Sequence, residues 1–239
     1  GLWNGSGVMT VNATNVESNI ATGNDADHGG AGIFNNGGTL NINGSEIVDN
    51  MSTGTAGSGG GLLSTAGEVT IENSVFEDNS ANRAGGAIEL IDGNLTFTSS
   101  GMFDNDVSGT AGTPAPGNGG GLHITGNSGT ILLTASLFEG NEAGREGGAL
   151  WNQSGTTMTI TNCIIDDNAS LGEMITNGGA GIFNNSGILV VNNSTISNNE
   201  DEGAAAAGGG IHNKAGGTVT VFASTLSRNA SANGGGVYN

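Results

Sequence analysis

Residues 29–36 read Gly-Gly-Ala-Gly-Ile-Phe-Asn-Asn, and residues 178–185 repeat the same eight letters. These copies are the best-preserved members of a series in which a glycine-rich step precedes an aliphatic residue. The aliphatic residues of the series are Leu2, Ile33, Leu62, Ile88, Leu122, Leu150, Ile182, Ile211 and Val237. They recur every 26 to 34 residues, and a period in this range is typical of a solenoid.

Each repeat also contains an asparagine with a fixed pattern before it, at Asn19, Asn50, Asn79, Asn105, Asn141, Asn168, Asn199 and Asn229. Ten and eight residues before each of these asparagines the side chain is apolar, and such alternation predicts a strand with one face inside. Five residues before it lies a small residue and three before it an apolar one, which predicts a further short strand. Helices are disfavoured because each glycine costs about 1 kcal/mol relative to alanine.

Strands that return to the same position in every repeat must stack in parallel, about 4.8 Å apart. Parallel crossovers are right-handed almost without exception. The sequence therefore predicts a single all-β domain over residues 1–239, a right-handed parallel β-helix of eight turns with three short strands per turn. The length variation falls in one loop per turn, between the asparagine and the next glycine-rich step, and variable loops on a rigid scaffold are frequent sites of recognition.

Two of the repeats carry motifs of a known family. Gly85-Gly86-Ala87-Ile88 and Gly147-Gly148-Ala149-Leu150, with Phe76-Glu77-Asp78-Asn79 and Phe138-Glu139-Gly140-Asn141, resemble the GGA(I/L) and FxxN repeats of the chlamydial polymorphic outer-membrane proteins and of related bacterial and archaeal surface β-helix proteins. The resemblance covers all eight turns in pattern. It implies a surface-exposed adhesin or structural passenger, and it implies no reaction.

Composition restricts the partners of the chain. Only 4 Lys and Arg stand against 22 Asp and Glu, for a net charge of −18, so we expect neither nucleic acid nor an anionic membrane as a partner. No apolar run is long enough to insert into a membrane. The chain begins and ends in the same register, which predicts a segment of a longer protein or a subunit that stacks end to end. We expect an extracellular or cell-surface location, with self-association or surface glycans or proteins of a host or neighbour as partners.

The position after each first-strand aliphatic should point away from the core. It holds Trp3, Phe34, Leu63, Glu89, His123, Trp151, Phe183, His212 and Tyr238. We call this set the ring column, because rings occupy seven of its nine positions. One interpretation is an exposed stripe, formed by the seven rings, that stacks on sugars or on a neighbouring solenoid. The alternative is that the variable loops fold back and bury these side chains.

Other columns favour structural roles. Stacked amides along the coil axis are predicted for the asparagines that end each repeat and for Asn4, Asn35, Asn152, Asn184, Asn213 and Asn239. Cys163 occupies a small inward position and is expected to be buried and inert. Carboxylates align before the repeat-ending asparagine. They form either a solvated acidic edge or a weak calcium site that would use Asp49, Asp78, Asp104, Asp166 and Asp167. No other cofactor is expected.

Three classes of function remain after these observations. A polysaccharide lyase or hydrolase needs a basic group or a pair of carboxylates that is unique to one cleft, and no turn is unique in this way, so we expect no enzyme. Ice binding would rest on the outward residues Thr10, Thr70, Thr96, Thr159 and Thr220, but Leu132, Val190, Glu68 and Glu72 interrupt that face. The leading hypothesis is a structural or adhesive surface solenoid that self-assembles, with a carbohydrate-binding or carbohydrate-active β-helix as the alternative.

Overall fold

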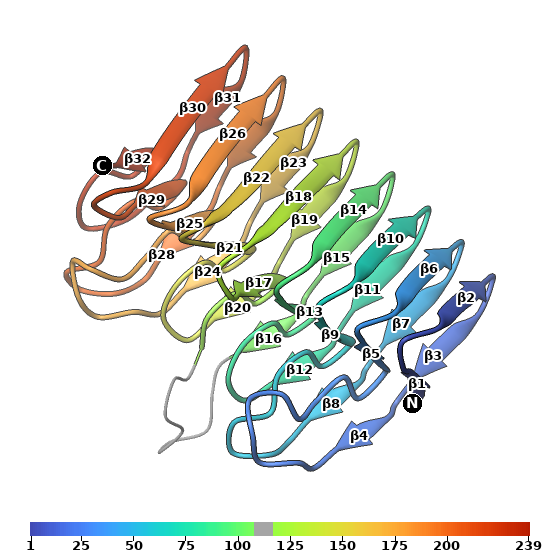
Figure 1. The fold of residues 1–239 in the computed structure, drawn as a ribbon. Helices are drawn as coiled ribbons and strands as arrows, with labels where there is room; N and C mark the ends of the chain where they lie inside the picture. The colour runs from blue at the N-terminus through green and yellow to red at the C-terminus, as the bar shows by residue number, and fades with distance from the viewer. Residues whose placement is uncertain (108–116) are drawn as a thin grey trace.

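The computed structural model describes residues 1–107 and 117–239, and within these ranges its regular elements are all β-strands. The strands form a parallel β-solenoid of about eight turns (Figure 1). Each strand pairs with the equivalent strands one turn before and one turn after, so all ladders are parallel. The predicted fold class is confirmed.

Four sheets run along the solenoid in the described part of the chain, with nine, eight, eight and seven strands. Sheet A contains the aliphatic series and comprises β1 (Leu2–Asn4), β5 (Ile33–Asn36), β9 (Leu62–Thr65), β13 (Ile88–Ile91), β17 (Leu122–Thr125), β21 (Leu150–Gln153), β25 (Ile182–Asn185), β29 (Ile211–Asn213) and β32 (Val237–Tyr238). Sheet B comprises β2 (Val8–Asn12), β6 (Thr39–Asn43), β10 (Glu68–Glu72), β14 (Asn94–Thr98), β18 (Gly129–Thr134), β22 (Thr156–Thr161), β26 (Ile188–Asn192) and β30 (Thr218–Phe222).

Each strand of sheet C ends shortly before the repeat asparagine, and each strand of sheet D begins directly after it. Sheet C comprises β3 (Asn15–Glu17), β7 (Glu46–Val48), β11 (Val75–Glu77), β15 (Gly101–Phe103), β19 (Leu137–Glu139), β23 (Ile164–Asp166), β27 (Thr195–Ser197) and β31 (Thr225–Ser227). Sheet D comprises β4 (Ile20–Ala21), β8 (Met51–Ser52), β12 (Ser80–Ala81), β16 (Asp106–Val107), β20 (Glu142–Ala143), β24 (Ala169–Ser170) and β28 (Glu200–Asp201).

Sheet D corrects the predicted count of three strands per turn. Its strands are only two residues long, and two residues are too few for hydrophobic alternation to be visible in a sequence. They form because the chain continues in parallel for one more step after the asparagine before the loop leaves the solenoid, as in the pairing of Ser80 with Met51.

The core fills the inside of the coil with the predicted columns. Leu95 and Phe97 of β14 pair in register with Ile131 and Leu133 of β18, and all four are buried. The alternation along sheet B is therefore confirmed. Val221 of β30 continues the inward column, opposite Val191, but it is 40 % exposed because β30 lies in the end turn.

The asparagines that end the repeats form the predicted ladder. The side-chain Nδ2 of Asn105 donates to Oδ1 of Asn141 at 2.9 Å and to the carbonyl of Phe76 at 3.0 Å. The backbone N–H of Asn105 donates to the same Oδ1 at 3.2 Å. Each buried amide is thus satisfied by the neighbouring turns. The second ladder, from Asn152 through Asn184 to Asn213, is also present.

The glycine-rich step before sheet A is a bend with one obligatory glycine. Gly30 and Gly179 have φ values of +59° and +64°, in the left-handed region that glycine enters without strain. A Cβ at Gly179 would lie 2.5 Å from the carbonyl oxygen of Ile182. The glycine two residues later is less restricted, because Ala87 and Ala149 occupy that column in other turns.

We expect Gly179→Ala to destabilise the protein by at least about 1 kcal/mol, since alanine is strained in the left-handed conformation. That loss corresponds to a fall of roughly 2–4 °C in Tm for a chain of this size. The control is Gly5→Ala, where the backbone is not left-handed and a Cβ would meet no atom within 4 Å, and its Tm should fall less. Equal falls in thermal unfolding followed by circular dichroism would contradict this assignment of the two glycines.

Candidate functional site

The ring column lies outside the main core, as predicted, but most of it is buried. Trp3 in the end turn is 64 % exposed, whereas Trp151, Phe183 and His212 are each at most 6 % exposed. The exposed stripe is therefore wrong for the inner turns, and the alternative interpretation, that the loops fold back over the column, accounts for their burial.

The loops are held over sheet A by a ladder of their own. Single parallel bridges connect Ser58, Ala84, Asn118, Glu146 and Gly178 from turn to turn, just before the bend that enters sheet A. The bend brings the chain directly against the ring column, because a Cβ at Gly119 would lie 2.7 Å from Cβ of His123. The loops and the ring column thus form a second buried layer on the outer face of sheet A.

The rings of this layer stack along the solenoid axis. The ring centroids of His123 and Trp151 lie 4.2 Å apart, with the planes inclined by 27°. Those of Phe183 and His212 lie 4.7 Å apart. Such contacts add roughly 0.5–1.5 kcal/mol per pair to the burial itself, so the column stabilises the loop layer.

A charged cluster interrupts the ring column in the middle turns. Glu89 of β13 is fully buried. One of its carboxylate oxygens accepts a hydrogen bond from Arg83 at 2.8 Å, and the other lies 2.7 Å from Nδ1 of His123. The hydroxyl of Thr125 also donates to Glu89, and Nε of Arg83 donates to Ser58 at 2.8 Å.

The electrostatics of the cluster favour an ionised Glu89. Burial on its own raises the pKa of a carboxyl, but the charges of His123 and Arg83, with the hydrogen bonds of His123 and Thr125, outweigh it, and the pKa of Glu89 is lowered. The cluster connects the loop before β13 with strands β13 and β17. We regard it as the candidate functional site, because it is the place in the described chain where a carboxylate, a guanidinium and an imidazole meet.

Sequence reasoning missed this cluster. Glu89 and His123 occupy adjacent positions of the ring column, but Arg83 lies in a loop, where no repeat relates it to that column. The available signal was the single glutamate in that column, because its carboxylate points into a buried layer and must find a cation.

A second polar group lies two turns further along the same layer. Glu146 accepts hydrogen bonds from Nε1 of Trp151 at 3.1 Å and from Nδ2 of Asn177 at 2.8 Å. The backbone N–H of Asn177 donates to the carbonyl of Met174. This carboxylate therefore anchors the turn 174–177 to the ring column.

Asp201 is the third carboxylate near this layer. It lies on the inward side of β28, opposite Ser170 of β24, and is 4 % exposed. Burial raises its pKa to about 7, although the Ser170 hydroxyl and the backbone of Gly203 and Ala207 lower it in part. His212 behaves in the opposite sense, because burial lowers its pKa.

The five aspartates proposed for calcium do not form one column. Asp49, Asp78, Asp104 and Asp167 share a bend with φ values between +51° and +55°, and Asp166 lies in the adjacent strand β23. Short polar residues tolerate the left-handed bend, which explains the aspartates structurally. None of the five belongs to a group of three ligand atoms within 4.8 Å of one another in the described residues, so calcium binding stays a prediction.

Two further sequence predictions concern Cys163 and the outward face of sheet B. Cys163 is a buried free thiol, and burial raises its pKa, which fits an inert small residue. On sheet B, Thr96 and Thr159 flank Leu132 in an outward column. Thr10, Thr70 and Thr220 continue it, interrupted by Val190. This face is therefore only partly threonine.

No family model matches the chain, and neither a curated protein nor a solved structure matches it. The resemblance to the chlamydial surface proteins therefore rests on the motifs and on the solenoid architecture alone. Across the described residues, no helix has the length and apolar character needed to cross a membrane.

We expect Glu89→Ala to cost about 3–5 kcal/mol at neutral pH, because it leaves the half-buried guanidinium of Arg83 without its counter-charge and the buried ring of His123 without its hydrogen-bond partner. The matched control, Glu72→Ala on the exposed edge of sheet B, should stay within about 0.5 kcal/mol of the wild type. Because the pKa of Glu89 is lowered on folding, the difference between wild type and Glu89→Ala should shrink as the pH falls below the ordinary carboxyl range. Chemical denaturation at neutral and acid pH measures both effects, and equal losses for the two variants would contradict the assignment.

The pH dependence of Asp201 has the opposite sign. Its pKa is raised from 3.8 to about 7 on folding, so the folded state favours the protonated carboxyl. The stability that this provides is present below the ordinary carboxyl pKa and is lost as the pH rises to about 7. Asp201→Asn should remove this part of the pH dependence and be more stable than the wild type at pH values above that range. The exposed control Asp49→Asn should keep the wild-type profile of Tm against pH.

Proposed function

We propose that the chain is a structural solenoid of an extracellular or cell-surface protein, a stiff rod that carries loops at fixed positions and associates through its end turns. The observation that carries this proposal is the continuity of the ladders. Sheet A joins nine strands in register, and the buried asparagine ladder runs beside it from turn to turn. Such stacking supports a rigid scaffold, because every turn is fixed by both of its neighbours.

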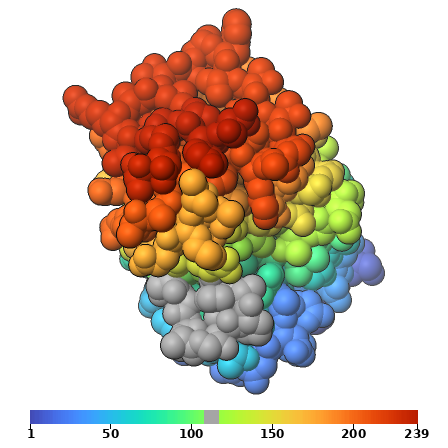
Figure 2. Space-filling model, turned by 90° about the vertical axis from the view of Figure 1, so that its left-hand side faces the viewer, coloured from blue at the N-terminus to red at the C-terminus, as the bar shows by residue number. Residues whose placement is uncertain are grey.

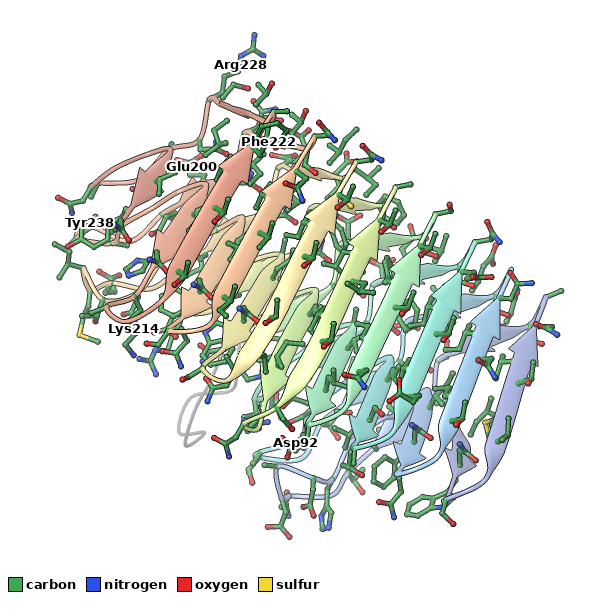
Figure 3. The ribbon with its side chains drawn as sticks, turned by 45° about the horizontal axis from the view of Figure 1, so that its top comes forward. Asp92, Glu200, Lys214, Phe222, Arg228 and Tyr238 are labelled. Carbon is green, nitrogen blue, oxygen red and sulfur yellow. The ribbon has the colours of Figure 1, made fainter. Side chains whose placement is uncertain are left out.

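The end turns support association. At one end the inward residue Leu2 is 37 % exposed, and at the other the inward residues Val221 and Val237 are 40 % and 42 % exposed, whereas their neighbours in the inner turns are buried. The two end turns lie at opposite ends of the molecule (Figure 2), and Phe222 projects at the C-terminal end (Figure 3). A terminal strand offers unpaired N–H and C=O groups to a further strand. Such a strand belongs either to further turns of a longer protein or to a second copy.

The adhesive part of the proposal places partner contacts on the loops. The ring column is buried in the inner turns, so the loops that cover it are the surface that a glycan or protein would meet. Within loop 171–177, Met174 and Ile175 are both exposed, and Asn177 anchors them from below. The proposal includes no reaction, because the Glu89 cluster is enclosed in the loop layer.

The two alternatives have less support. Sugar stacking on the ring column needs exposed rings, and among the seven rings only Trp3 is exposed, with Phe34 and Tyr238 half-buried. Ice binding needs a regular uncharged face, and the outward side of sheet B contains exposed Glu68 and Glu72 on β10, with Leu132 and Val190 in its central column. The scaffold proposal depends neither on exposed rings nor on the outward residues of sheet B.

We expect the purified chain to form filaments of uniform width, longer at higher protein concentration, in negative-stain electron microscopy. Val221→Asp should abolish the filaments while the circular dichroism spectrum stays unchanged, because the substitution puts a charge on an exposed end of the core. The control Val190→Asp places the same charge on the outer face of sheet B and should leave the filaments intact. Isolated short rods at every concentration of the wild type would sink the association part of the proposal.

A further inference from the structure

The loop between β4 and sheet A in the first turn brings two carboxylates and an imidazole together. Asp25, Asp27 and His28 each place a ligand atom within 4.8 Å of the other two. All three side chains are exposed. Among the described residues, this is the one group of three or more histidine, cysteine or carboxylate side chains whose ligand atoms lie within 4.8 Å of one another. The equivalent loop of the next turn, residues 53–58, contains neither a carboxylate nor a histidine.

The contact inside the group is a long ion pair, at a spacing that also fits two ligands of one bound ion. Nδ1 of His28 and Oδ2 of Asp25 lie 3.6 Å apart, whereas hydrogen-bonded nitrogen and oxygen atoms lie about 2.7–3.2 Å apart. Two ligand atoms at about 2.0–2.2 Å from a tetrahedral zinc ion are separated by roughly 3.3–3.6 Å. Nδ1 accepts a long hydrogen bond from the backbone N–H of Asp25, at 3.4 Å. An ion bound at Nδ1 would take the place of this bond, because the nitrogen offers a single lone pair.

The loop holds this arrangement through backbone contacts. The backbone N–H of His28 donates to the carbonyl of Asp25 at 2.9 Å and closes a tight turn. Asn24 accepts hydrogen bonds from the backbone N–H and the hydroxyl of Thr55 in the next turn, at 3.1 and 3.4 Å. Gly23 is required beneath the ring, because a Cβ there would lie 2.6 Å from Cβ of His28. The three ligands are therefore positioned before any ion arrives.

The donor set identifies the class of ion. Calcium and magnesium prefer shells made of oxygen atoms, whereas an imidazole nitrogen with carboxylates suits divalent ions of the first transition series, including zinc. We propose that Asp25, Asp27 and His28 bind such an ion, with its remaining coordination positions open to water or to a side chain of a partner. This site is distinct from the aspartate bends considered for calcium, and it does not depend on the scaffold proposal.

The test is isothermal titration of the full chain, freed of metal, with Zn²⁺, together with the visible absorption of the Co²⁺ form. We expect one ion per chain. His28→Gln and Asp27→Asn should each weaken binding at least about 10-fold, since even the loss of a residue that only supports a ligand has an effect of that size. The intensity of the Co²⁺ bands should fall in His28→Gln, because a nitrogen ligand is lost.

The control variant is Asp49→Asn, which removes an exposed carboxylate from the bend of sheet C and should bind Zn²⁺ like the wild type. Because these residues lie in an exposed loop, we expect the metal-free variants to keep the wild-type Tm, and this measurement separates a folding defect from a loss of binding. Absence of Zn²⁺ binding at millimolar concentration, or equal binding by wild type and His28→Gln, would overturn the proposal.

Discussion

The structure depends on one constraint, which is that the asparagine amides buried at the bends find their partners one turn away. A buried amide without a hydrogen bond costs about 1–3 kcal/mol, and the solenoid has such groups at each turn. The asparagine ladder avoids this cost, because the asparagine of each turn supplies hydrogen-bond partners to the asparagine of the turn before it. Oδ1 of Asn141 accepts from both the backbone and the side chain of Asn105, while Nδ2 of Asn141 donates to Asn168 and to the carbonyl of Met102.

The bend before sheet A explains the glycine pattern. Its first position has a left-handed φ, and a Cβ there would meet the carbonyl three residues further on in the same turn, as at Gly179 and Ile182. Later positions of the same bend admit alanine, as Ala31, Ala149 and Ala180 show. A left-handed φ recurs before each ladder asparagine, at Asp49 or Asp104, where a short polar side chain replaces glycine. Each column thus selects its residues by a local backbone conformation, and this selection makes the repeat visible in the sequence.

The columns could be predicted because their period and their residue types repeat, and what could not be predicted is what occurs once. Sheets A, B and C and both asparagine ladders follow from alternation and spacing. Sheet D is too short to leave a pattern. The burial of Phe183 and Trp151 depends on where loops of different sequence settle, and no periodicity encodes that. In the cluster of Glu89, Arg83 and His123, the contact between Glu89 and His123 joins residues 34 positions apart, and only the return of the chain after one turn places them together.

The loop layer differs from the core in how it deals with charge. The core repeats apolar columns and contains no carboxylate in the described residues, so its turns are chemically alike. The loop layer instead contains Glu89, Glu146 and, at its margin, Asp201, each with a different set of partners. Glu89 is neutralised by Arg83. Glu146 accepts hydrogen bonds from Trp151 and Asn177 and lies 4.0 Å from Arg145, and Asp201 lies near a hydroxyl and backbone groups and has a raised pKa. Because each carboxylate fixes a particular loop, the layer gives every turn its own surface while the core keeps all turns alike. A scaffold that presents different loops at fixed intervals needs this division between a repeated interior and an individual outer layer.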